Sequence, residues 1–459
     1  MKRLWKVIPP CLSDVLGFEA VLNETEGFGI IDDPSRYKPI RMGQGGQSHG
    51  GQTGRTDGHG PGSDGGRAFA ARAGGEAHGA GSFDRAARMR GVRVMNSDIR
   101  NEDIITGTEE KVMRTFERGM EQYAPDFVLL CCAPSSSMIN SDLEYAAEKI
   151  TVQSGLPAAE VKIDGEKDYL YGIGVTLETL GRILLTPRET LAGTVNLLGA
   201  NTIDWTTDML ASVDKLIANA GWRVLSHWGT KETTENLKRA AAAQVNVVVS
   251  EAGLKLARFM EREFGIPYVA GAPFGAKNAE NLALQLSKFK IDGIVAENGS
   301  DDLFISGSEM ENRSLTSSSK ASEEYGSSDL TCAVTGIAVQ ETDVPEILIV
   351  AEQFIANAVR ETFLALGQRN IRVLSFYDMD RAYMLPGDKK LTGEDDFTAQ
   401  ANADSVRMII ADLDYRPLVK KKVQYIGFPD GGSFSPVHPT ENFNMTGELL
   451  DLWLEERLA

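Results

Sequence analysis

The sequence predicts an α/β protein made of three Rossmann-like parallel-sheet domains around a central cleft. First, short apolar runs alternate with amphipathic stretches, which is typical of parallel α/β units. Second, two segments of biased composition interrupt this alternation, at 41–91 and from 307 onward. Third, 459 residues with 42% hydrophobic side chains are enough for several cores. We therefore predict domains at 1–200, 201–306 and 341–459, joined by a Ser- and Glu-rich linker at 307–340.

The first domain is expected to begin with an amphipathic helix at 14–22, directly after Cys11. A second helix is expected at 109–123, followed by a buried strand at 127–132 (FVLLCC). Pro134 then interrupts the chain, and another helix is expected from about residue 141. These elements form the first α/β block.

The second and third domains continue the alternation of strands and helices. Strands are expected at 195–199, 223–226, 245–250, 267–270, 347–351 and 371–375. Helices are expected at 205–220, 232–242, 254–264, 279–289, 356–366 and 447–458, with a helix or a helix-to-strand transition at 401–409. Joints between the blocks are expected near 200 and at 335–345.

The segment 41–91 differs from the rest of the chain in composition. Its 51 residues hold 16 of the 46 glycines and three of the five histidines, His49, His59 and His78. Without a core-forming period, such a composition cannot offset the entropy of ordering, so we expect a flexible insertion. A histidine-rich metal-binding tract is the alternative, although the histidine spacings are irregular.

Charge and cysteine content exclude several classes of protein. With 47 Lys and Arg against 65 Asp and Glu, the net charge is −18, which argues against binding to nucleic acid or to anionic membranes. Four cysteines are too few for a disulfide framework. The basic N-terminus lacks the apolar core of a signal peptide, and no apolar run is long enough to span a membrane. We expect a soluble, cytoplasmic protein.

Familiar catalytic motifs are absent from the sequence, so the cysteines are the leading candidates for chemistry. Gly172-Ile-Gly174 lacks the third glycine and the preceding strand of a dinucleotide-binding fingerprint. Cys131 and Cys132 end the strand at 127–132, where ligands bind in open parallel sheets. Cys11 precedes a helix whose positive end would favour a thiolate. Each could instead be a small buried apolar residue, which is our interpretation of Cys332.

Several stretches of the chain resemble component 1 of nitrogenase and its relatives. The relatives include nitrogenase cofactor scaffolds, the dark-operative protochlorophyllide reductase and the nickel-sirohydrochlorin reductive cyclase. The most specific similarity is 97–111 (SDIRNEDIITGTEEK), and 127–143 (FVLLCCAPSSSMINSDL) resembles the family strand whose cysteine binds a cluster. Further similar stretches are 11–22, 196–203, 259–275, 350–357 and 411–417. The resemblance covers nearly the whole chain outside the 41–91 insertion.

The sequence also departs from the family pattern. The family's second cluster cysteine has no counterpart, because 27–34 (GFGIIDDP) contains none. The stretch around Val249 and Ser250 lacks the cysteine that holds the active-site cofactor, and His438 lies in sequence that does not align clearly. We therefore expect neither a molybdenum-iron-type cofactor nor reduction of dinitrogen.

The resemblance implies a [4Fe–4S] cluster bound by Cys11 and by one of Cys131 and Cys132. Such a cluster normally takes four ligands, so a homodimer or a heterodimer with a paralogous subunit would complete it at the interface. Because adjacent strand residues point to opposite faces, only one of the pair can face the crevice, and we favour Cys131, with Cys132 packed into the core. Asp32 or Asp33 could replace a thiolate, or both could lie in a solvated turn.

The sequence leaves three functions open. The first is the catalytic subunit of a reductase that takes low-potential electrons from an ATP-driven iron-sulfur protein resembling the nitrogenase iron protein and reduces a small molecule. The second is a scaffold for the assembly of a metal cluster or cofactor. The third is a cluster-free partner subunit. The sequence does not identify the substrate.

Overall fold

The computed structural model describes most of the chain outside its compositionally biased segments. The described residues are 12–33, 93–100, 102–132, 141–163, 165, 167–290, 346–432 and 443–458. Cys11, Cys332 and His438 fall outside these residues, as do the whole predicted insertion at 41–91 and the whole linker at 307–340. No described helix has the length and apolar character that a membrane crossing requires.

The first block is a four-stranded parallel sheet with helices on both faces. Its strands lie in the order β2-β1-β3-β4. In chain order the elements are α1 (Asp14–Asn23), β1 (Phe28–Asp32), β2 (Val94–Asn96), α3 (Asp103–Thr106), α4 (Glu109–Tyr123), β3 (Val128–Cys132), α5 (Leu143–Ser154), β4 (Ala158–Val161) and α6 (Tyr169–Leu184). The helix α5 begins where the Asp142 side chain accepts a hydrogen bond from the Tyr145 backbone N–H.

The second block is also a four-stranded parallel sheet, with the order β6-β5-β7-β8. Its elements are β5 (Leu191–Leu198), α7 (Thr207–Asn219), β6 (Arg223–Trp228), α8 (Thr234–Arg239), η2 (Ala240–Ala242), β7 (Ala243–Val248), η3 (Glu251–Gly253), α9 (Leu254–Phe264), β8 (Tyr268–Ala270) and α10 (Ala276–Ser287). This sheet therefore begins at β5, ahead of the joint predicted near 200.

The third block is a five-stranded parallel sheet with the order β11-β10-β9-β12-β13. Its elements are β9 (Glu346–Val350), α12 (Gln353–Ala365), β10 (Ile371–Ser375), η4 (Arg381–Tyr383), β11 (Lys389–Lys390), α13 (Glu394–Ala401), β12 (Val406–Ala411), η5 (Leu413–Leu418), β13 (Gln424–Gly427) and α14 (Glu448–Leu458). The predicted fold class, three parallel-sheet α/β units, is confirmed.

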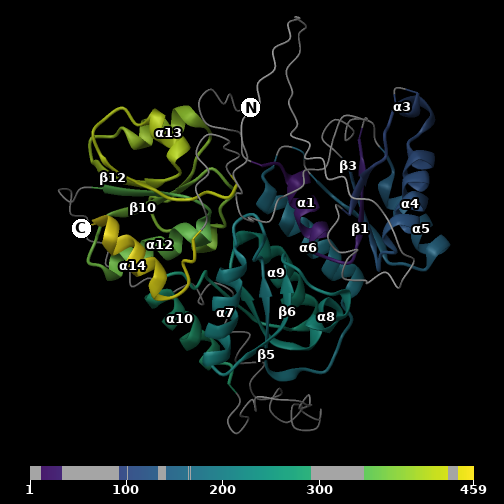
Figure 1. Ribbon diagram of the computed structural model, residues 1–459, viewed down its shortest axis with the longest axis horizontal. Coiled ribbons are helices and arrows are strands. Elements are labelled where there is room, and N and C mark those ends of the chain that lie inside the picture. Colours follow the sequence, from purple (N-terminus) through teal and green to yellow (C-terminus); the bar gives the residue numbers. More distant parts are fainter. Residues whose placement is uncertain are drawn as a thin grey trace, which may run out of the picture.

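The three sheets lie in separate lobes, and α1, α6 and α9 occupy the space between them (Figure 1). Glycines allow α1 and α6 to approach closely. A Cβ on Gly172 would lie 2.0 Å from the Asp14 carbonyl oxygen, and one on Gly17 would lie 2.2 Å from the Tyr169 carbonyl oxygen. Gly172-Ile-Gly174 therefore lies within a packing helix and does not form a phosphate-binding turn.

The elements that the sequence did not predict are mostly short. The strand β1 (FGIID) is buried along its whole length, but its last residue Asp32 is an acid and a second acid, Asp33, follows it, so the sequence suggests a solvated turn. The strands β4, β11 and β13 contain two to four residues with little apolar periodicity. By contrast, the predicted helices 109–123 and 254–264 match α4 and α9 at both ends.

Candidate functional site

Cys131 and Cys132 end β3 and point to opposite faces of the first sheet. Cys131 pairs in register with Ile31, is fully buried, and belongs to the same apolar cluster as Val15 and Phe18 of α1. Cys132 pairs with Asp32, is half-buried, and packs on the other face against the cluster of α4 and α5. The sequence favours Cys131 in the crevice and Cys132 in the core, whereas the structure buries Cys131 more completely.

The electrostatic surroundings keep both thiols protonated in the metal-free protein. Burial raises the pKa of Cys131 well above its ordinary value, and nearby acids, including Glu19 and Asp14 of α1, add to this effect. Burial, followed by the charge of Asp32, raises the pKa of Cys132 to about 12. Neither thiol is a preformed thiolate, so a metal ion or cluster would have to displace its proton.

Asp32 and Asp33 are buried, and the expectation of a solvated turn is wrong for both. Asp32 is the last residue of β1, and its Oδ1 accepts a hydrogen bond of 2.6 Å from the Ser97 hydroxyl. Desolvation raises the pKa of Asp32, while the hydroxyls of Ser97, Ser141 and Thr108 act in the opposite direction. We call Asp32, Asp33, Ser97, Cys131 and Cys132 the first-sheet edge.

The first-sheet edge could contribute at most a partial set of metal ligands. Among the described residues, no group of three or more His, Cys, Asp and Glu side chains could hold a metal ion. Asp32 and Cys132 occupy paired positions on neighbouring strands, so a carboxylate and a thiol lie side by side. These donors suit an iron-sulfur cluster only if further ligands come from Cys11 or from another subunit.

A second polar region lies where the three blocks meet, and we call it the central junction. In it, the Tyr169 hydroxyl from the start of α6 donates hydrogen bonds to both carboxyl oxygens of Asp204, at 2.7 and 2.9 Å. Asn201 holds the same carboxyl through its Nδ2 at 2.9 Å. Asn201 and Asp204 follow β5, so this contact links the first block to the second.

The third block contributes a matching carboxyl group to the central junction. The hydroxyls of Tyr377 and Tyr415 both donate to the Asp430 carboxyl, Tyr415 at 2.6 Å. The rings of Tyr169 and Tyr377 meet edge to face at 5.5 Å. A Cβ on Gly432 would lie 2.3 Å from both tyrosine side chains, so only glycine fits there.

The central junction also contains Glu251 and Glu352, from the second and third blocks. The Glu352 carboxyl accepts hydrogen bonds from the backbone N–H groups of Glu251 and Ile355, at 3.0 and 2.9 Å. Glu352 is the N-cap residue of α12, and its carboxyl also binds the backbone of η3. The contact therefore joins the second block to the third.

Burial is the main cause of raised pKa values in the central junction. Desolvation raises the pKa of Asp204 to about 6, of Asp430 and Glu251 to about 7, and of Glu352 to about 8. Neighbouring carboxyl groups add to the shift in each case, while hydrogen bonds oppose it in Asp204, Asp430 and Glu352. These groups can hold and release protons near neutral pH, which is the property required of general acids and bases.

Sequence reasoning missed the central junction, although one signal pointed to part of it. Asn201 and Asp204 follow the predicted strand at 195–199, at the carboxyl end where ligand sites gather in parallel sheets. Asp430 follows β13, a strand that the sequence did not predict. Tyr169 and Tyr377 have no sequence pattern that distinguishes them from core aromatics.

Comparisons with known proteins point to one family. The family model described as "Nitrogenase component 1 type Oxidoreductase" matches residues 71–297. The chain is 24% identical over 194 residues to a component of the light-independent protochlorophyllide reductase of Adiantum capillus-veneris, covering 40% of this chain and 38% of that protein. It is 20% identical to the nitrogenase molybdenum-iron protein alpha chain of Methanosarcina barkeri, covering 42% and 37%.

A third relative is named as a cofactor biosynthesis protein and not as an enzyme subunit. The nitrogenase iron-molybdenum cofactor biosynthesis protein NifE of Methanosarcina barkeri is 23% identical, with 44% of this chain and 46% of that protein covered. The alignments thus span less than half the length of these curated relatives.

Solved structures support the same fold. The nitrogenase Cp1 structure at pH 6.5 has a TM-score of 0.63 and 10% identity, covering all of this chain and 93% of that one. At this identity the similarity shows the fold alone. The family match over 71–297, the curated relatives and the three parallel sheets agree, and together they support a nitrogenase component 1-like family for this chain.

Proposed function

We propose that this chain is a subunit of a nitrogenase component 1-like oxidoreductase that receives low-potential electrons through a [4Fe–4S] cluster between subunits. The acceptor would be a small molecule other than dinitrogen. The electron donor would be an ATP-dependent reductase resembling the nitrogenase iron protein, and the second subunit would be another copy or a paralogue. The match to the family model supports the class of reaction.

The observation that carries the proposal is the position of Cys131. It lies at the carboxyl end of β3 on the face covered by α1, the helix that follows Cys11 in the sequence. Leu12, the neighbour of Cys11, donates its backbone N–H to the Gly432 carbonyl at 3.0 Å, so the chain enters α1 beside the central junction. We therefore keep Cys11 and Cys131 as the proposed ligands from this chain.

Cys132 is the alternative ligand, with Asp32 or Asp33 as an additional oxygen ligand. Its half-buried side chain is more accessible than that of Cys131, and it lies in register with Asp32. The two arrangements use opposite faces of the sheet, so they exclude each other.

The chain itself would bury the cluster and supply protons. An iron-sulfur cluster, when bound, carries one electron at a time at a potential set by burial and hydrogen bonding. Asp204 and Asp430, whose pKa values are raised to about 6 and 7, would hold protons near the site where electrons arrive. Reduction of a small molecule consumes protons together with electrons, and the central junction can provide them.

The test is iron and sulfide analysis with low-temperature EPR on anaerobically purified protein. About four irons per dimer are expected, because two ligands per chain complete one four-ligand cluster. Cys11→Ser and Cys131→Ser should each remove the iron and the electron transfer, while Cys132→Ser and Cys332→Ser should retain both. Loss of iron in Cys132→Ser alone would move the site to the other face of β3. Wild-type protein that stays free of iron after reconstitution would refute the proposal.

A scaffold or cluster-free partner is the second candidate function. The observation that favours it is the filled central junction, where Tyr169, Tyr377 and Gly432 pack against one another between the three blocks. One relative is itself a cofactor biosynthesis protein. A scaffold would acquire iron only when given a preassembled cluster, and a cluster-free subunit would acquire none but would co-purify with a paralogue.

A further inference from the structure

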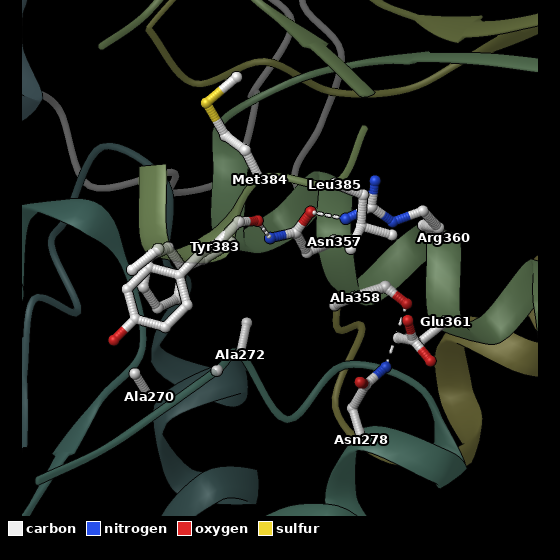
Figure 2. A pocket seen from close by; sticks show the side chains of 13 residues that line it. Ala270, Ala272, Asn278, Asn357, Ala358, Arg360, Glu361, Tyr383, Met384 and Leu385 are labelled. Carbon is white, nitrogen blue, oxygen red and sulfur yellow. Dashed lines mark hydrogen bonds between the residues drawn. The ribbon is translucent and has the colours of Figure 1, made fainter. Parts of the chain in front are cut away.

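A cavity of about 340 Å³ lies between the second and third blocks, away from the first-sheet edge. Its walls come from the end of β8, from α10 and α12, and from η4 with the segment that follows it (Figure 2). Small residues, Ala270, Gly271 and Ala272, leave the space open on one side, and Phe354 and Leu385 add apolar surface. This volume is in the range of small-molecule sites in proteins.

Two polar side chains of this cavity, Glu361 and Asn278, lie near each other, while Asn357 and Arg360 form a separate hydrogen-bonded pair (Figure 2). Glu361 is half-buried, and within the described part of the chain it accepts no hydrogen bond and forms no ion pair. Asn278 donates its Nδ2 to the carbonyls of Phe274 and Ala358, at 2.7 and 3.0 Å, so its Oδ1 remains an acceptor. Two hydrogen-bond acceptors therefore lie at this end of the cavity.

The neighbouring cation Arg360 does not neutralise Glu361, because Arg360 already forms an ion pair with Asp388. The Arg360 Nη1 donates to both carboxyl oxygens of Asp388, at 2.8 and 2.7 Å, and its Nη2 donates to Asn357 at 2.6 Å. The side chains of Arg360 and Asp388 are 4% and 1% exposed, so this pair is a closed ion pair inside the protein. With one cation and two carboxyl groups, the polar end of the cavity has an excess of negative charge.

We propose that this cavity binds a small primary amine with an apolar body, its ammonium group held by Glu361 and Asn278. Burial raises the pKa of the Glu361 carboxyl, since the charge of Arg360 opposes desolvation only in part. A bound cation would supply the missing partner of this carboxyl group. The Arg360 Nε is buried and has no acceptor among the described residues, so the rival ligand is an anion that binds there. The excess of carboxyl groups favours the cation. This inference does not depend on the proposed cluster.

The experiment is a calorimetric titration of the full chain with benzylammonium, benzyl alcohol and benzoate, which share one apolar body. Benzylammonium should bind with a Kd on the order of 1 mM, as expected for so small a ligand, and the other two should bind at least about tenfold more weakly. Glu361→Gln should reduce the affinity for benzylammonium by about tenfold or more, because a charge-assisted hydrogen bond is lost. Glu121→Gln, an exposed acid on α4, is the matched control and should leave the affinity unchanged.

Ala272→Leu provides an independent test, because a larger side chain in the wall should exclude all three probes. Circular dichroism melting of each variant establishes that it is folded before titration. Tighter binding of benzoate than of benzylammonium, or unchanged affinity in both folded Glu361→Gln and folded Ala272→Leu, would overturn the assignment. Either result can be obtained on iron-free protein, so it is independent of the test of the proposed function.

Discussion

The first-sheet edge and the central junction both lie at the carboxyl ends of parallel strands, yet they are built differently. At the first-sheet edge, neighbouring residues of one strand divide between two faces, so Cys131 and Cys132 cannot act on the same ligand. At the central junction, side chains from three blocks meet: Asp204 accepts from the Tyr169 hydroxyl, and Asp430 accepts from two further tyrosine hydroxyls. The first arrangement is local to a sheet, whereas the second exists only when the blocks are docked.

Among these variants, loss of the Asp430 carboxyl should lower the free energy of unfolding most. Asp430→Ala removes the acceptor of the Tyr377 and Tyr415 hydroxyls, and the free energy of unfolding should fall by about 3 kcal/mol or more. Chemical denaturation of both proteins measures the difference. Asp430→Asn keeps an acceptor oxygen and should lose less than half as much. Equal losses in the two variants would show that the tyrosine hydrogen bonds do not stabilise the junction.

The second-largest effect should be the pH dependence of stability that Asp204 gives to the central junction. The pKa of Asp204 is about 6 in the folded protein and about 4 in an unfolded chain, so the folded state binds the proton more tightly. Stability from this group is therefore greatest below about pH 4 and is lost as pH rises through 6, by about 1.4 kcal/mol per pH unit.

The variant Asp204→Asn isolates this contribution. A plot of its free energy of unfolding against pH should lack the part of the slope that Asp204 causes. His227, whose pKa its partners Asp214 and Glu232 raise to about 9 against desolvation, loses its contribution only at higher pH and is unchanged in the variant. Parallel curves for the wild type and Asp204→Asn between pH 4 and 6 would contradict the raised pKa.

Replacing either cysteine should lower the free energy of unfolding of the metal-free protein, by different and smaller amounts. Cys131→Ser places a hydroxyl in the apolar cluster of α1 and should cost about 2 kcal/mol, whereas half-buried Cys132→Ser should cost less than about 1 kcal/mol. Thermal unfolding in the presence of a chelator measures both. The reverse order would mean that Cys132, and not Cys131, faces the core.

The smallest effect is expected at the hydrogen bond between Ser97 and Asp32. Ser97→Ala removes the 2.6 Å bond to a buried carboxyl group and should cost about 1 kcal/mol. The exposed Ser287→Ala, which loses only a bond to a carbonyl of its own helix, is the control and should be near zero. Equal stability of the two variants would show that the Ser97 hydrogen bond does not stabilise the first-sheet edge.

The sequence predicted the elements with a strong periodic pattern. The helix α9 was predicted at both ends because apolar residues recur along one face and Gly265 follows it with a positive φ of 69°. The strand β3 was predicted from its continuous apolar run. The strand β1 was missed because its terminal Asp32 and the following Asp33 look like a turn, although both are buried and Asp32 accepts a hydrogen bond from Ser97.

Chain periodicity and reactive residue types determine what the sequence alone can reveal here: three α/β blocks, a cysteine pair at a strand end, and a resemblance to one family. The tertiary structure alone decided which face each cysteine occupies, that Asp32 is buried, and that Tyr169, Asp204, Tyr377 and Asp430 meet. Aspartate and tyrosine are common in loops and cores, and their pKa values depend on desolvation by distant segments. Only the docking of the three blocks brings these segments together.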